Sequence, residues 1–324
     1  MAKAVRIHET GGPDALVFED VEVGAPGPGE ALLRQTAIGL NFIDVYFRTG
    51  LYPAPSLPVT LGMEAAGVVE AVGEDVADVR PGDRVTYAGA LGAYAEARTV
   101  AADRLIKLPD DISDRQAAAM TLQGLTAQYL IRRTHRVAPG ETILVHAAAG
   151  GVGLIVCQWA KHLGATVIGT VGSDEKAELA KAHGCEHPII YTREDFVARV
   201  KEITGGEGVP VVYDSVGKDT FAQSLDCLRA LGLMVSFGQS SGDVPPLDLR
   251  TLTMKGSLYL TRPSLATYAA KRSDLLAGAA ELFEVVGSGA VKVPARQTYP
   301  LSDTADAHRD LEARKTTGST VLIP

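Results

Sequence analysis

The sequence is poor in cysteine and in clustered positive charge. Its 324 residues include three cysteines, Cys157, Cys185 and Cys227, and no two of them are spaced as Cys-x-x-Cys. An odd, sparse set is typical of reduced thiols, so we expect a cytoplasmic protein without a disulfide framework. The formal net charge of -8 and the absence of a basic run argue against nucleic acid as a partner and against an anionic membrane surface.

The sequence also has no segment that is typical of a signal peptide or a membrane span. Residues 1–7 lack an apolar core, and the most apolar long stretch, residues 143–160, contains His146 and a glycine cluster. A buried core segment explains this stretch better than a span does. With 46% hydrophobic and 22% charged residues, the chain is long enough for two domains that each have a core.

Metal ligands are scarce in the first 125 residues, which contain no cysteine and one histidine, His8. A catalytic zinc normally needs three protein ligands, and three cysteines cannot form a four-cysteine site, so we expect no metal. One cluster elsewhere, residues 183–187 (His-Gly-Cys-Glu-His), has suitable residue types. Gly184 should end a helix there, so we interpret the cluster as a surface loop before a strand.

The pattern of the chain changes near residue 125. Before it, β-branched runs alternate with Gly-Pro and Pro-Gly turns and no long helical period interrupts them, which predicts a small, partly open barrel. Ser113 is expected to cap a helix that runs towards Arg132. The strands expected in this first part cover residues 30–40, 65–72, 83–87 and 93–100.

After this helix, short apolar strands alternate with helical segments. Six strands joined by crossover helices predict an α/β domain with a doubly wound parallel sheet, from residue 126 to residue 263. Residues 264–324, with helical patterns at 268–286 and 305–314 and a final strand, are expected to complete the first domain, 1–125. The strands expected in the sheet are 142–146, 166–170, 188–191, 209–214, 233–237 and 257–260, and the helices are 151–163, 174–183, 195–203 and 220–230.

A glycine loop lies between the first strand and the first helix of the expected sheet. Residues 146–153 read His-Ala-Ala-Ala-Gly-Gly-Val-Gly, so Gly150, Gly151 and Val152 open the helix, while Ala148 stands where the usual G-x-G-x-x-G pattern has its first glycine. Missing side chains let a backbone approach a pyrophosphate, and a helix N-terminus offers it free N–H groups. The context between strand and helix predicts a dinucleotide site.

The end of the second strand favours NADPH over NADH. An NAD site usually carries an acid there to bind the ribose hydroxyls, but this strand ends in Gly172-Ser173. Ser173 can bind a 2′-phosphate by hydrogen bonding, and Lys176 can supply positive charge one helical turn later. Asp174 and Glu175 lie nearby and can point outward.

Motifs along essentially the whole chain resemble those of one family, the zinc-free, zeta-crystallin-like quinone oxidoreductases of the medium-chain dehydrogenase/reductase superfamily. The resemblance implies a Rossmann domain, a GroES-like domain and a homodimer. Asn41 stands where zinc-containing relatives have a cysteine ligand, and Met63 replaces their histidine, so Glu64 is expected to be structural. The motifs are residues 39–46, 48–52, 61–69, 81–85, 147–153, 212–217, 236–242 and 260–263.

The resemblance also implies a set of cofactor contacts in this chain. Tyr191 and Arg314 would join Lys176 near the adenosine phosphate. The complete set is Phe42, Ile43, Asp44, Val45, Tyr46, Tyr129, Gly150, Gly151, Val152, Gly172, Ser173, Lys176, Tyr191, Ser215, Val216, Phe237, Gly238, Gln239, Ser240, Thr261, Arg262, Pro263 and Arg314.

Reduction of a quinone needs orientation beside the nicotinamide and hydrogen-bond donors for the developing oxyanion. Asn41, Tyr46 and Tyr52 are the candidates for these catalytic roles, because they lie in loops that match the family's substrate cleft. Asn41 would orient the substrate or the nicotinamide amide. An alternative is that the two tyrosines only form an apolar wall.

Three other functions remain as alternatives. The same hydride chemistry would suit a reductase of α,β-unsaturated carbonyls or enoyl thioesters. A non-catalytic NADPH-binding structural or RNA-binding protein is a second alternative, which the acidic charge disfavours. Residues 238–242 match the esterase pattern Gly-x-Ser-x-Gly, but Pro245 and Pro246 follow where a nucleophile elbow needs a helix.

Two structural expectations concern the surface. The strand in residues 255–260, from Lys255 to Leu260, would leave an open sheet edge, and pairing of two such edges would form a homodimer. His146 is expected to be a packed residue or a cap, and His8, His135, His162 and His308 are expected at surface or loop positions.

Overall fold

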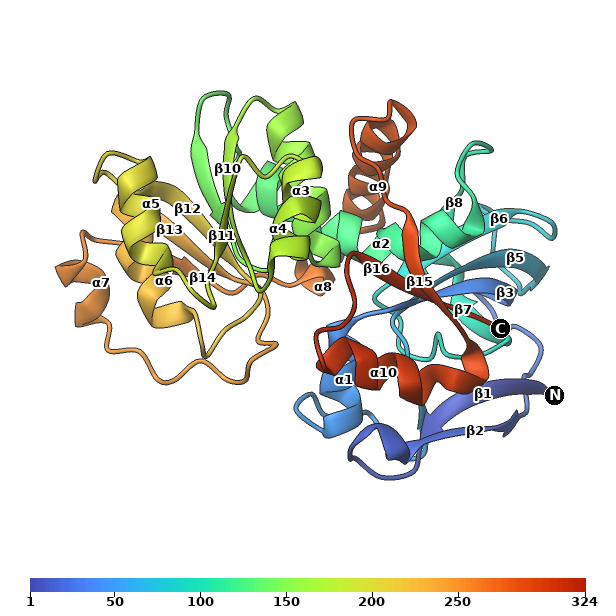
Figure 1. Ribbon diagram of the computed structural model, residues 1–324. Coiled ribbons are helices and arrows are strands. Elements are labelled where there is room, and N and C mark those ends of the chain that lie inside the picture. Colours follow the sequence, from blue (N-terminus) through green and yellow to red (C-terminus); the bar gives the residue numbers. More distant parts are fainter. The chain divides into compact units, whose positions relative to one another are not determined.

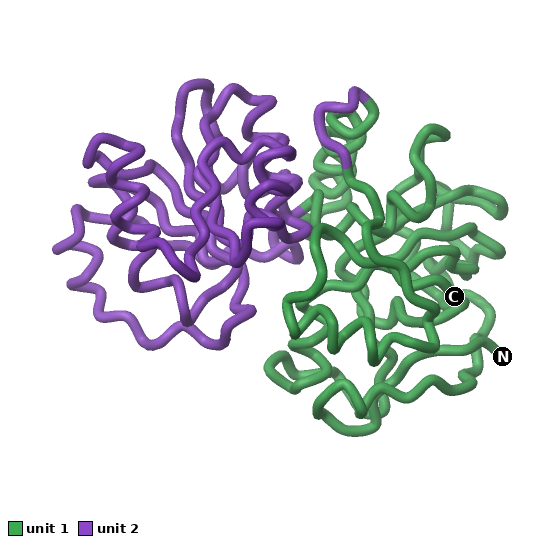
Figure 2. Tube along the Cα trace, in the orientation of Figure 1, with its two compact units in different colours: residues 1–125, 269–287, 293–324 green, residues 126–268, 288–292 purple.

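The computed structural model describes residues 1–324, which divide into two compact units (Figure 2). The first contains Met1–Leu125, Ala269–Gly287 and Val293–Pro324, and the second contains Thr126–Tyr268 and Ser288–Lys292. The α/β domain that was expected to end at residue 263 therefore extends to Tyr268. Tyr268 stays with the second unit because its ring stacks on that of Tyr129, at 4.5 Å between centroids.

A short return segment, Ser288–Lys292, also belongs to the second unit, although the sequence assigned it to the first domain. Gln158 explains this difference. Its amide nitrogen donates to the Lys292 carbonyl (3.1 Å), and its oxygen accepts the Lys292 N–H (2.9 Å). A single side chain thus satisfies both backbone groups of Lys292 within the second unit.

The second unit has the expected α/β Rossmann architecture, with six parallel strands in the order β11-β10-β9-β12-β13-β14 (Figure 1). The chain starts in the middle of the sheet at β9, builds outward to β11, and then returns to the other side of β9 with β12. The strands are β9 Thr142–Val145, β10 Thr166–Val171, β11 His187–Ile190, β12 Val209–Asp214, β13 Leu228–Ser236 and β14 Tyr259–Thr261.

The helices of this unit follow the expected alternation, with one clear correction. The helix expected at 220–230 ends at Cys227, and β13 begins at Leu228, which pairs with Val209 of β12. Leu231 then has a φ of 59°, and the strand register shifts around it, which helical periodicity could not reveal. The helices are α3 Gly151–His162, α4 Asp174–Ala182, α5 Phe196–Ile203, α6 Phe221–Cys227, α7 Arg250–Met254 and α8 Leu265–Tyr268, and the π-helix Leu130–Thr134 precedes β9.

The first unit contains the expected β-rich domain, in which strand β3 is central. β3 pairs with β5, β7 and β16, so the C-terminal strand completes the sheet that the N-terminal part begins. A smaller sheet has the order β2-β1-β4. The strands are β1 Ala2–Ile7, β2 Leu16–Val21, β3 Glu30–Leu40, β4 Val59–Thr60, β5 Glu64–Val72, β6 Arg84–Ala88, β7 Ala97–Ala101, β8 Ile106–Lys107, β15 Ala295–Pro300 and β16 Ser319–Ile323.

The helices of the first unit differ from the expectation in two places. A short helix, α1 (Phe42–Thr49), lies in the region where no long helical period was expected, and the pattern at 268–286 is split between α8 and α9 (Arg272–Gly287). The helix that Ser113 caps is α2 (Asp114–Tyr129), and the Ser113 hydroxyl accepts the Gln116 N–H at 3.2 Å. The last helix is α10 (Thr304–Glu312).

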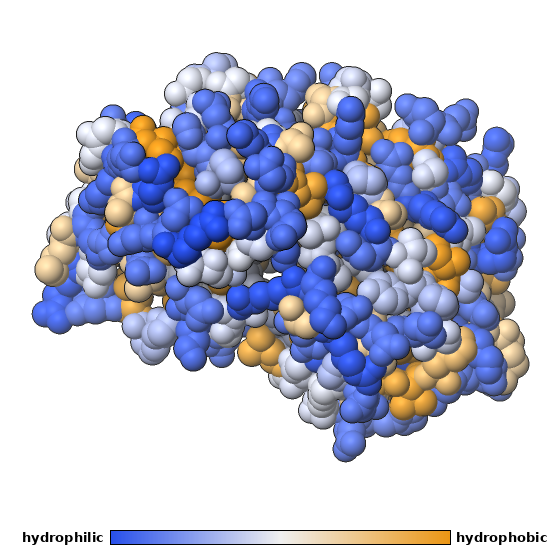
Figure 3. Space-filling model, in the orientation of Figure 1, coloured by the Kyte–Doolittle hydropathy of each residue, from blue (hydrophilic) through white to orange (hydrophobic).

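Each unit has its own apolar core. Leu33, Ile38 and Tyr87 belong to the core of the first unit, and Leu144, Ile168 and Val212 belong to that of the second. Hydrophilic residues cover most of the face seen in Figure 3. No helix has both the length and the apolar character that crossing a membrane requires.

Candidate active site

The expected cofactor residues of the second unit gather at one edge of its sheet. Because all six strands are parallel, their carboxyl ends lie at the same edge, and the strand order reverses between β9 and β12. Ligands of open α/β sheets bind outside the carboxyl ends at such a reversal. The residues that follow the six strands are Gly150 to Val152, Gly172 to Lys176, Tyr191, Ser215 and Val216, Phe237 to Ser240, and Arg262 and Pro263.

The glycine loop lets the backbone between β9 and α3 turn tightly. Gly150 is the N-cap of α3, and Ala147 takes a left-handed φ of 52°. A Cβ on Gly153 would lie 2.3 Å from the Ala147 carbonyl oxygen and 2.8 Å from the Ala148 Cα, so only glycine fits there. The first N–H groups of any helix have no carbonyl partner within the helix, so the start of α3 offers donors to an anion.

The loop after β10 starts a second helix in the same way. Ser173 is the N-cap of α4, and its hydroxyl accepts the Lys176 N–H at 3.3 Å. The Tyr191 hydroxyl lies 3.1 Å from where a Cβ on Gly172 would be, so a larger residue there would crowd it. The structure thus brings Gly172, Ser173, Lys176 and Tyr191 into one neighbourhood.

Arg193 belongs to this neighbourhood, and the sequence analysis missed it. Its guanidinium binds both carboxylate oxygens of Asp174, at 2.6 and 2.8 Å. This pairing neutralises the negative charge of Asp174, which lies next to Ser173. Arg193 precedes α5 by three positions and Asp174 opens α4, so no periodicity in the sequence links them.

Two further loops of the edge are fastened to each other. The buried Asp214 carboxylate accepts the N–H groups of Val216 (2.7 Å) and Gly217 (3.2 Å), which fixes the turn after β12. The Ser240 N–H then donates to the Ser215 carbonyl at 3.1 Å. No helix follows residues 238–242 until α7, so the esterase alternative lacks the helix that a nucleophile elbow needs.

In the first unit, Asn41 lies at the start of α1 and is held through both its backbone and its side chain. Its N–H donates to Asp44 Oδ2 at 2.8 Å, and its side-chain nitrogen donates to Glu64 Oε1 at 2.7 Å. Gln123 donates to Asn41 Oδ1 at 3.1 Å and accepts from the Ser319 hydroxyl at 2.6 Å. Glu64 is thus a buried partner of Asn41, as expected.

Burial changes the acidity of the two carboxyl groups beside Asn41. Desolvation raises the pKa of Glu64 to about 8, although hydrogen bonds from Asn41 and the Leu122 N–H lower it. Desolvation likewise raises the pKa of Asp44 to about 7, against hydrogen bonds from Asn41 and Tyr94. Both groups can therefore exchange a proton near neutral pH.

His308 is a correction to the expectation that it lies at the surface. It is fully buried, with Nε2 3.1 Å from the Tyr94 hydroxyl and Nδ1 3.1 Å from an Arg48 nitrogen. Tyr94 in turn donates to Asp44 Oδ2 at 2.9 Å. Burial, and the Arg48 charge beside it, lower the pKa of His308 to about 3, so its ring is neutral at ordinary pH. His146 is packed as expected, between Thr170 and Ser224.

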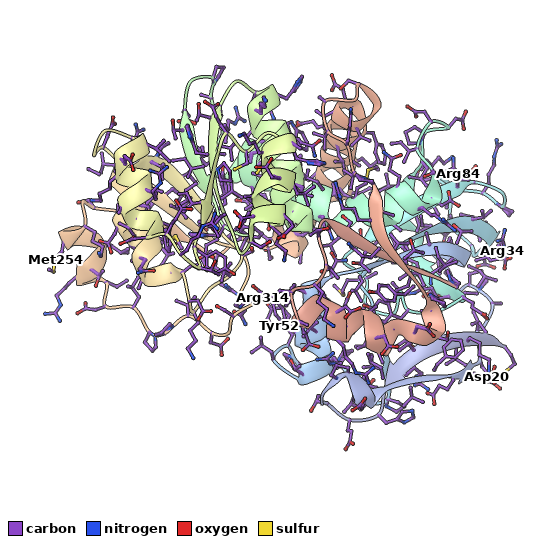
Figure 4. All side chains as sticks on the ribbon, viewed as in Figure 1. Asp20, Arg34, Tyr52, Arg84, Met254 and Arg314 are labelled. Carbon is purple, nitrogen blue, oxygen red and sulfur yellow. The ribbon has the colours of Figure 1, made fainter.

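The two candidate tyrosines lie against each other. The rings of Tyr46, on α1, and Tyr52, in the loop after it, meet edge to face with 5.2 Å between centroids. Phe42 and Phe47 extend this aromatic group on either side. Figure 4 labels Tyr52 in this loop. The geometry is compatible both with donors and with an apolar wall.

The remaining expected cofactor residues differ in exposure. Phe42 and Ile43 are partly exposed, whereas Asp44 and Val45 are buried, so the Asp44 carboxylate has a structural task within α1. Arg314, labelled in Figure 4, is exposed just after α10 with a left-handed φ of 58°.

The residues that remain at the zinc position of related enzymes do not suit zinc. Asn41 is engaged by Glu64 and Gln123, and Met63 offers a thioether where a histidine would be needed. No group of three or more His, Cys, Asp or Glu side chains is arranged to hold a metal ion, and Cys185 of the 183–187 cluster is buried.

Comparisons with known proteins identify the family of the chain. Residues 27–110 match the alcohol dehydrogenase GroES-like domain, and residues 151–273 match a family described as zinc-binding dehydrogenase. The chain is 54% identical to a quinone oxidoreductase of Pseudomonas aeruginosa, with both chains covered completely. The chain belongs to the quinone oxidoreductase family. The resemblance and the fold class that the sequence indicated are therefore confirmed.

Two further relatives of the chain are informative about the cofactor and the substrate. A crystal structure of Escherichia coli quinone oxidoreductase complexed with NADPH matches with a TM-score of 0.98 and 52% identity, and each chain is covered completely. A 2-haloacrylate reductase of a Burkholderia species is 49% identical, over 100% of this chain and 99% of the relative. The family thus contains reductases with different electron acceptors.

Proposed function

We propose that this chain reduces quinones with NADPH as the electron donor. The observation that carries the proposal is the edge of the second unit's sheet, where a glycine loop, the capped start of α4 and Lys176 follow neighbouring strands, and no acid ends β10. The NADPH complex of the Escherichia coli relative, at 52% identity, supports the choice of cofactor.

The cradle of the glycine loop fits a dinucleotide. The N-terminus of α3 would hold the pyrophosphate, and Ser173, Lys176 and Tyr191 would hold the adenosine phosphate. When bound, NADPH supplies a hydride or single electrons, so that NADPH, a quinone and one proton yield NADP⁺ and a hydroquinone. The full contact set is the one expected from the resemblance, including Tyr129, Thr261 to Pro263 and Arg314.

The residues of the first unit would orient the quinone and stabilise charge on its oxygen. Asn41 keeps one side-chain N–H beyond its bond to Glu64, and the hydroxyls of Tyr46 and Tyr52 are further donors. The proton comes from solvent or a side chain. The donor set does not suit a metal, so we assign none a role.

The direct test is NADPH oxidation with 1,4-benzoquinone by the purified protein. We expect turnover that EDTA does not change. No affinity for NADPH, or activity lost on chelation and restored by zinc, would contradict the proposal. Binding of NADPH without oxidation by any acceptor would instead support the non-catalytic structural or RNA-binding alternative.

A second candidate function is reduction of α,β-unsaturated carbonyl compounds. The relative that favours it is the 2-haloacrylate reductase, at 49% identity over the whole chain. A side-by-side assay with 1,4-benzoquinone, an enone and 2-chloroacrylate at equal NADPH decides between the two. Higher kcat/KM for an unsaturated carbonyl compound would replace quinone as the substrate class.

The preference for NADPH has its own test. Lys176→Ala should raise the KM for NADPH by about tenfold and leave that for NADH nearly unchanged, because the ammonium would bind only the 2′-phosphate. Glu178, on the same helix α4, offers a control in Glu178→Ala. A clear preference of the unchanged protein for NADH would contradict this assignment.

We further propose a cytoplasmic homodimer that pairs through β14. This strand ends the sheet, and Tyr259 and Leu260 are exposed on it. Met254, at 84% exposure on α7 (Figure 4), and Leu231, whose N–H binds the Gly256 carbonyl, add apolar surface nearby. Light scattering should give a dimer, and Tyr259→Lys should weaken it. A monomer for the unchanged protein would contradict this proposal.

A further inference from the structure

Two chains of buried hydrogen bonds end at the carboxylates beside Asn41. The first runs from Ser319 through Gln123 and Asn41 to Glu64, and the second runs from Arg48 through His308 and Tyr94 to Asp44. All these residues belong to the first unit. What distinguishes the two chains is whether their donors and acceptors can be exchanged.

The chain to Asp44 has one direction. Arg48 can only donate, so the Nδ1 of His308 must accept and its Nε2 carries the proton. Nε2–H then donates to Tyr94, which donates to Asp44 Oδ2. A proton on Asp44 must therefore sit on Oδ1, the oxygen that has no partner among the protein groups. This chain fixes α1 and, through Oδ2, the backbone of Asn41.

The chain to Glu64 has two complete directions. With Glu64 ionised, Ser319 donates to Gln123, Gln123 donates to Asn41, and Asn41 donates to Glu64. With a proton on Glu64 Oε1, this carboxyl donates to Asn41, whose amide turns over and donates to Gln123, which turns over and donates to Ser319. Both directions keep the three hydrogen bonds between these four side chains, because each amide has a donor end and an acceptor end and the Ser319 hydroxyl can donate or accept.

We propose that Glu64 and Gln123 are positioning residues that set which end of the Asn41 amide faces a ligand, and that a proton on Glu64 reverses it. The inference rests on the proposed function, in which Asn41 meets the substrate or the nicotinamide. Glu64 itself is only 1% exposed, and both its oxygens are occupied, by Asn41 and by the Leu122 N–H at 2.6 Å. It therefore acts through Asn41.

Several neighbours contribute to the charge balance of Glu64. The charge of Asp44 on α1 disfavours the ionised form of Glu64. The charge of Glu64 in turn contributes to the raised pKa values of Tyr87 on β6 and Tyr94 before β7. Gly39 on β3 permits the close approach of Glu64, because a Cβ there would lie 2.2 Å from Oε1. Burial raises the pKa of Glu64 to about 8, so the reversal falls within the range of an ordinary assay.

Glu64→Gln is the sharpest variant. The Leu122 N–H must face the oxygen of the new amide, so its nitrogen must donate to Asn41, as a protonated Glu64 does. We expect kcat/KM for 1,4-benzoquinone to titrate near pH 8 in the unchanged protein. In Glu64→Gln the transition near pH 8 should be absent, and any change that is left should lie near pH 7, where Asp44 titrates.

Gln123→Met tests the other end of the chain. Methionine keeps the volume but has no amide, so we expect kcat/KM to fall about tenfold, mainly in kcat, since a mispositioned amide costs on the order of 1.4 kcal/mol. Gln35→Met is the matched control: Gln35 is a buried glutamine of the same unit that donates to the Ala93 and Ala95 carbonyls, accepts from the Tyr87 hydroxyl and does not contact Asn41. It should lower stability and leave the pH profile intact.

A second readout needs neither cofactor nor substrate. In the free protein, the side-chain amide NMR signals of Asn41 and Gln123 should shift together as Glu64 titrates, and Glu64→Gln should abolish this shift. Uncoupled signals, a transition near pH 8 that persists in Glu64→Gln, or Gln123→Met matching Gln35→Met would each overturn the inference. Absence of NADPH oxidation by the unchanged protein would contradict the proposed function instead, because the NMR readout does not depend on it.

Discussion

The candidate sites of the two units are built from different materials. In the second unit, backbone groups after neighbouring parallel strands form the edge, and glycines let them come close. In the first unit, buried side chains from α1, β5, α2 and β16 form a hydrogen-bonded network around Asn41. The first kind of site tolerates many side chains but no added volume, whereas the second depends on the donor or acceptor character of each side chain.

This difference predicts how each site fails. A backbone site should be destroyed by a single methyl group at a crowded glycine. A side-chain network should respond to pH and to isosteric changes that alter hydrogen bonding and leave volume intact.

The largest effect is expected for Gly153→Ala. The new methyl group would lie 2.3 Å from the Ala147 carbonyl oxygen and 2.8 Å from the Ala148 Cα, so the loop must move away from the start of α3. We expect the Kd for NADPH, measured by fluorescence titration, to rise by about 100-fold or more. Gly24→Ala is the control, since nothing lies within 4 Å of its Cβ position. A Kd unchanged within threefold would contradict the backbone account.

The network of the first unit should make stability fall as pH rises from 6.5 to 8. The pKa values of Asp44 and Glu64 are raised from 3.8 to about 7 and from 4.5 to about 8, so the folded state holds their protons more tightly than the unfolded state. Their contribution is complete below pH 3.8 and is lost as pH rises through the folded values. Over this window we expect a loss of about 2 kcal/mol in the free energy of unfolding.

Below this window the histidines act in the opposite sense. The pKa of His308 is lowered from 6.5 to about 3 and that of His146 is also lowered by burial, so their contribution is lost as pH falls from 6.5. This loss offsets the gain from the two carboxyl groups, so the pH dependence of stability should flatten below pH 6.5. Urea unfolding at pH 6.5 and 8 measures the slope, and Glu64→Gln should remove the larger part of it. Equal urea midpoints at the two pH values would contradict the assignment.

A smaller effect is expected for the tyrosine hydroxyls. Tyr46→Phe and Tyr52→Phe together should lower kcat/KM for 1,4-benzoquinone by about tenfold, roughly the value of one or two hydrogen bonds to a developing charge. Tyr299→Phe is the control, because its hydroxyl binds Asp310 on α10 instead. Full kcat/KM in the double variant would show that Tyr46 and Tyr52 are only an apolar wall.

The sequence predicted the backbone site well because its signals are local. The glycine loop, the strand end at Ser173 and the parallel alternation are contiguous patterns, and the bounds of β12 and β3 agree with the structure to the residue. Helix ends were less predictable where a positive φ or a side-chain contact decided them, as at Leu231 and Tyr268.

Most of the side-chain network could not be predicted from the sequence. Asn41 and Glu64 were singled out, but Gln123 and Ser319 come from segments 82 and 278 residues after Asn41 (123 − 41 and 319 − 41) and carry no motif. His308 is followed by Arg309 and Asp310 on a polar helix, so its burial could not be recognised. Such networks depend on tertiary packing that no local pattern encodes.

The smallest effect is expected for Arg193, a side chain that adjusts the charge of the site built from backbone groups. This side chain is bound to Asp174 at the start of α4, so it neutralises the negative charge of that carboxylate. Arg193→Ala would leave the Asp174 carboxylate uncompensated beside Ser173 and Lys176, and we expect the Kd for NADPH to rise about threefold while that for NADH stays constant, as for an exposed charge pair. Removing the repulsion as well, in Arg193→Ala/Asp174→Asn, should restore most of the affinity. Fluorescence titration of both cofactors at low and high salt measures the effect, which salt should reduce. If the double variant binds NADPH no better than Arg193→Ala does, Arg193 contacts the cofactor directly and does not act by neutralising Asp174.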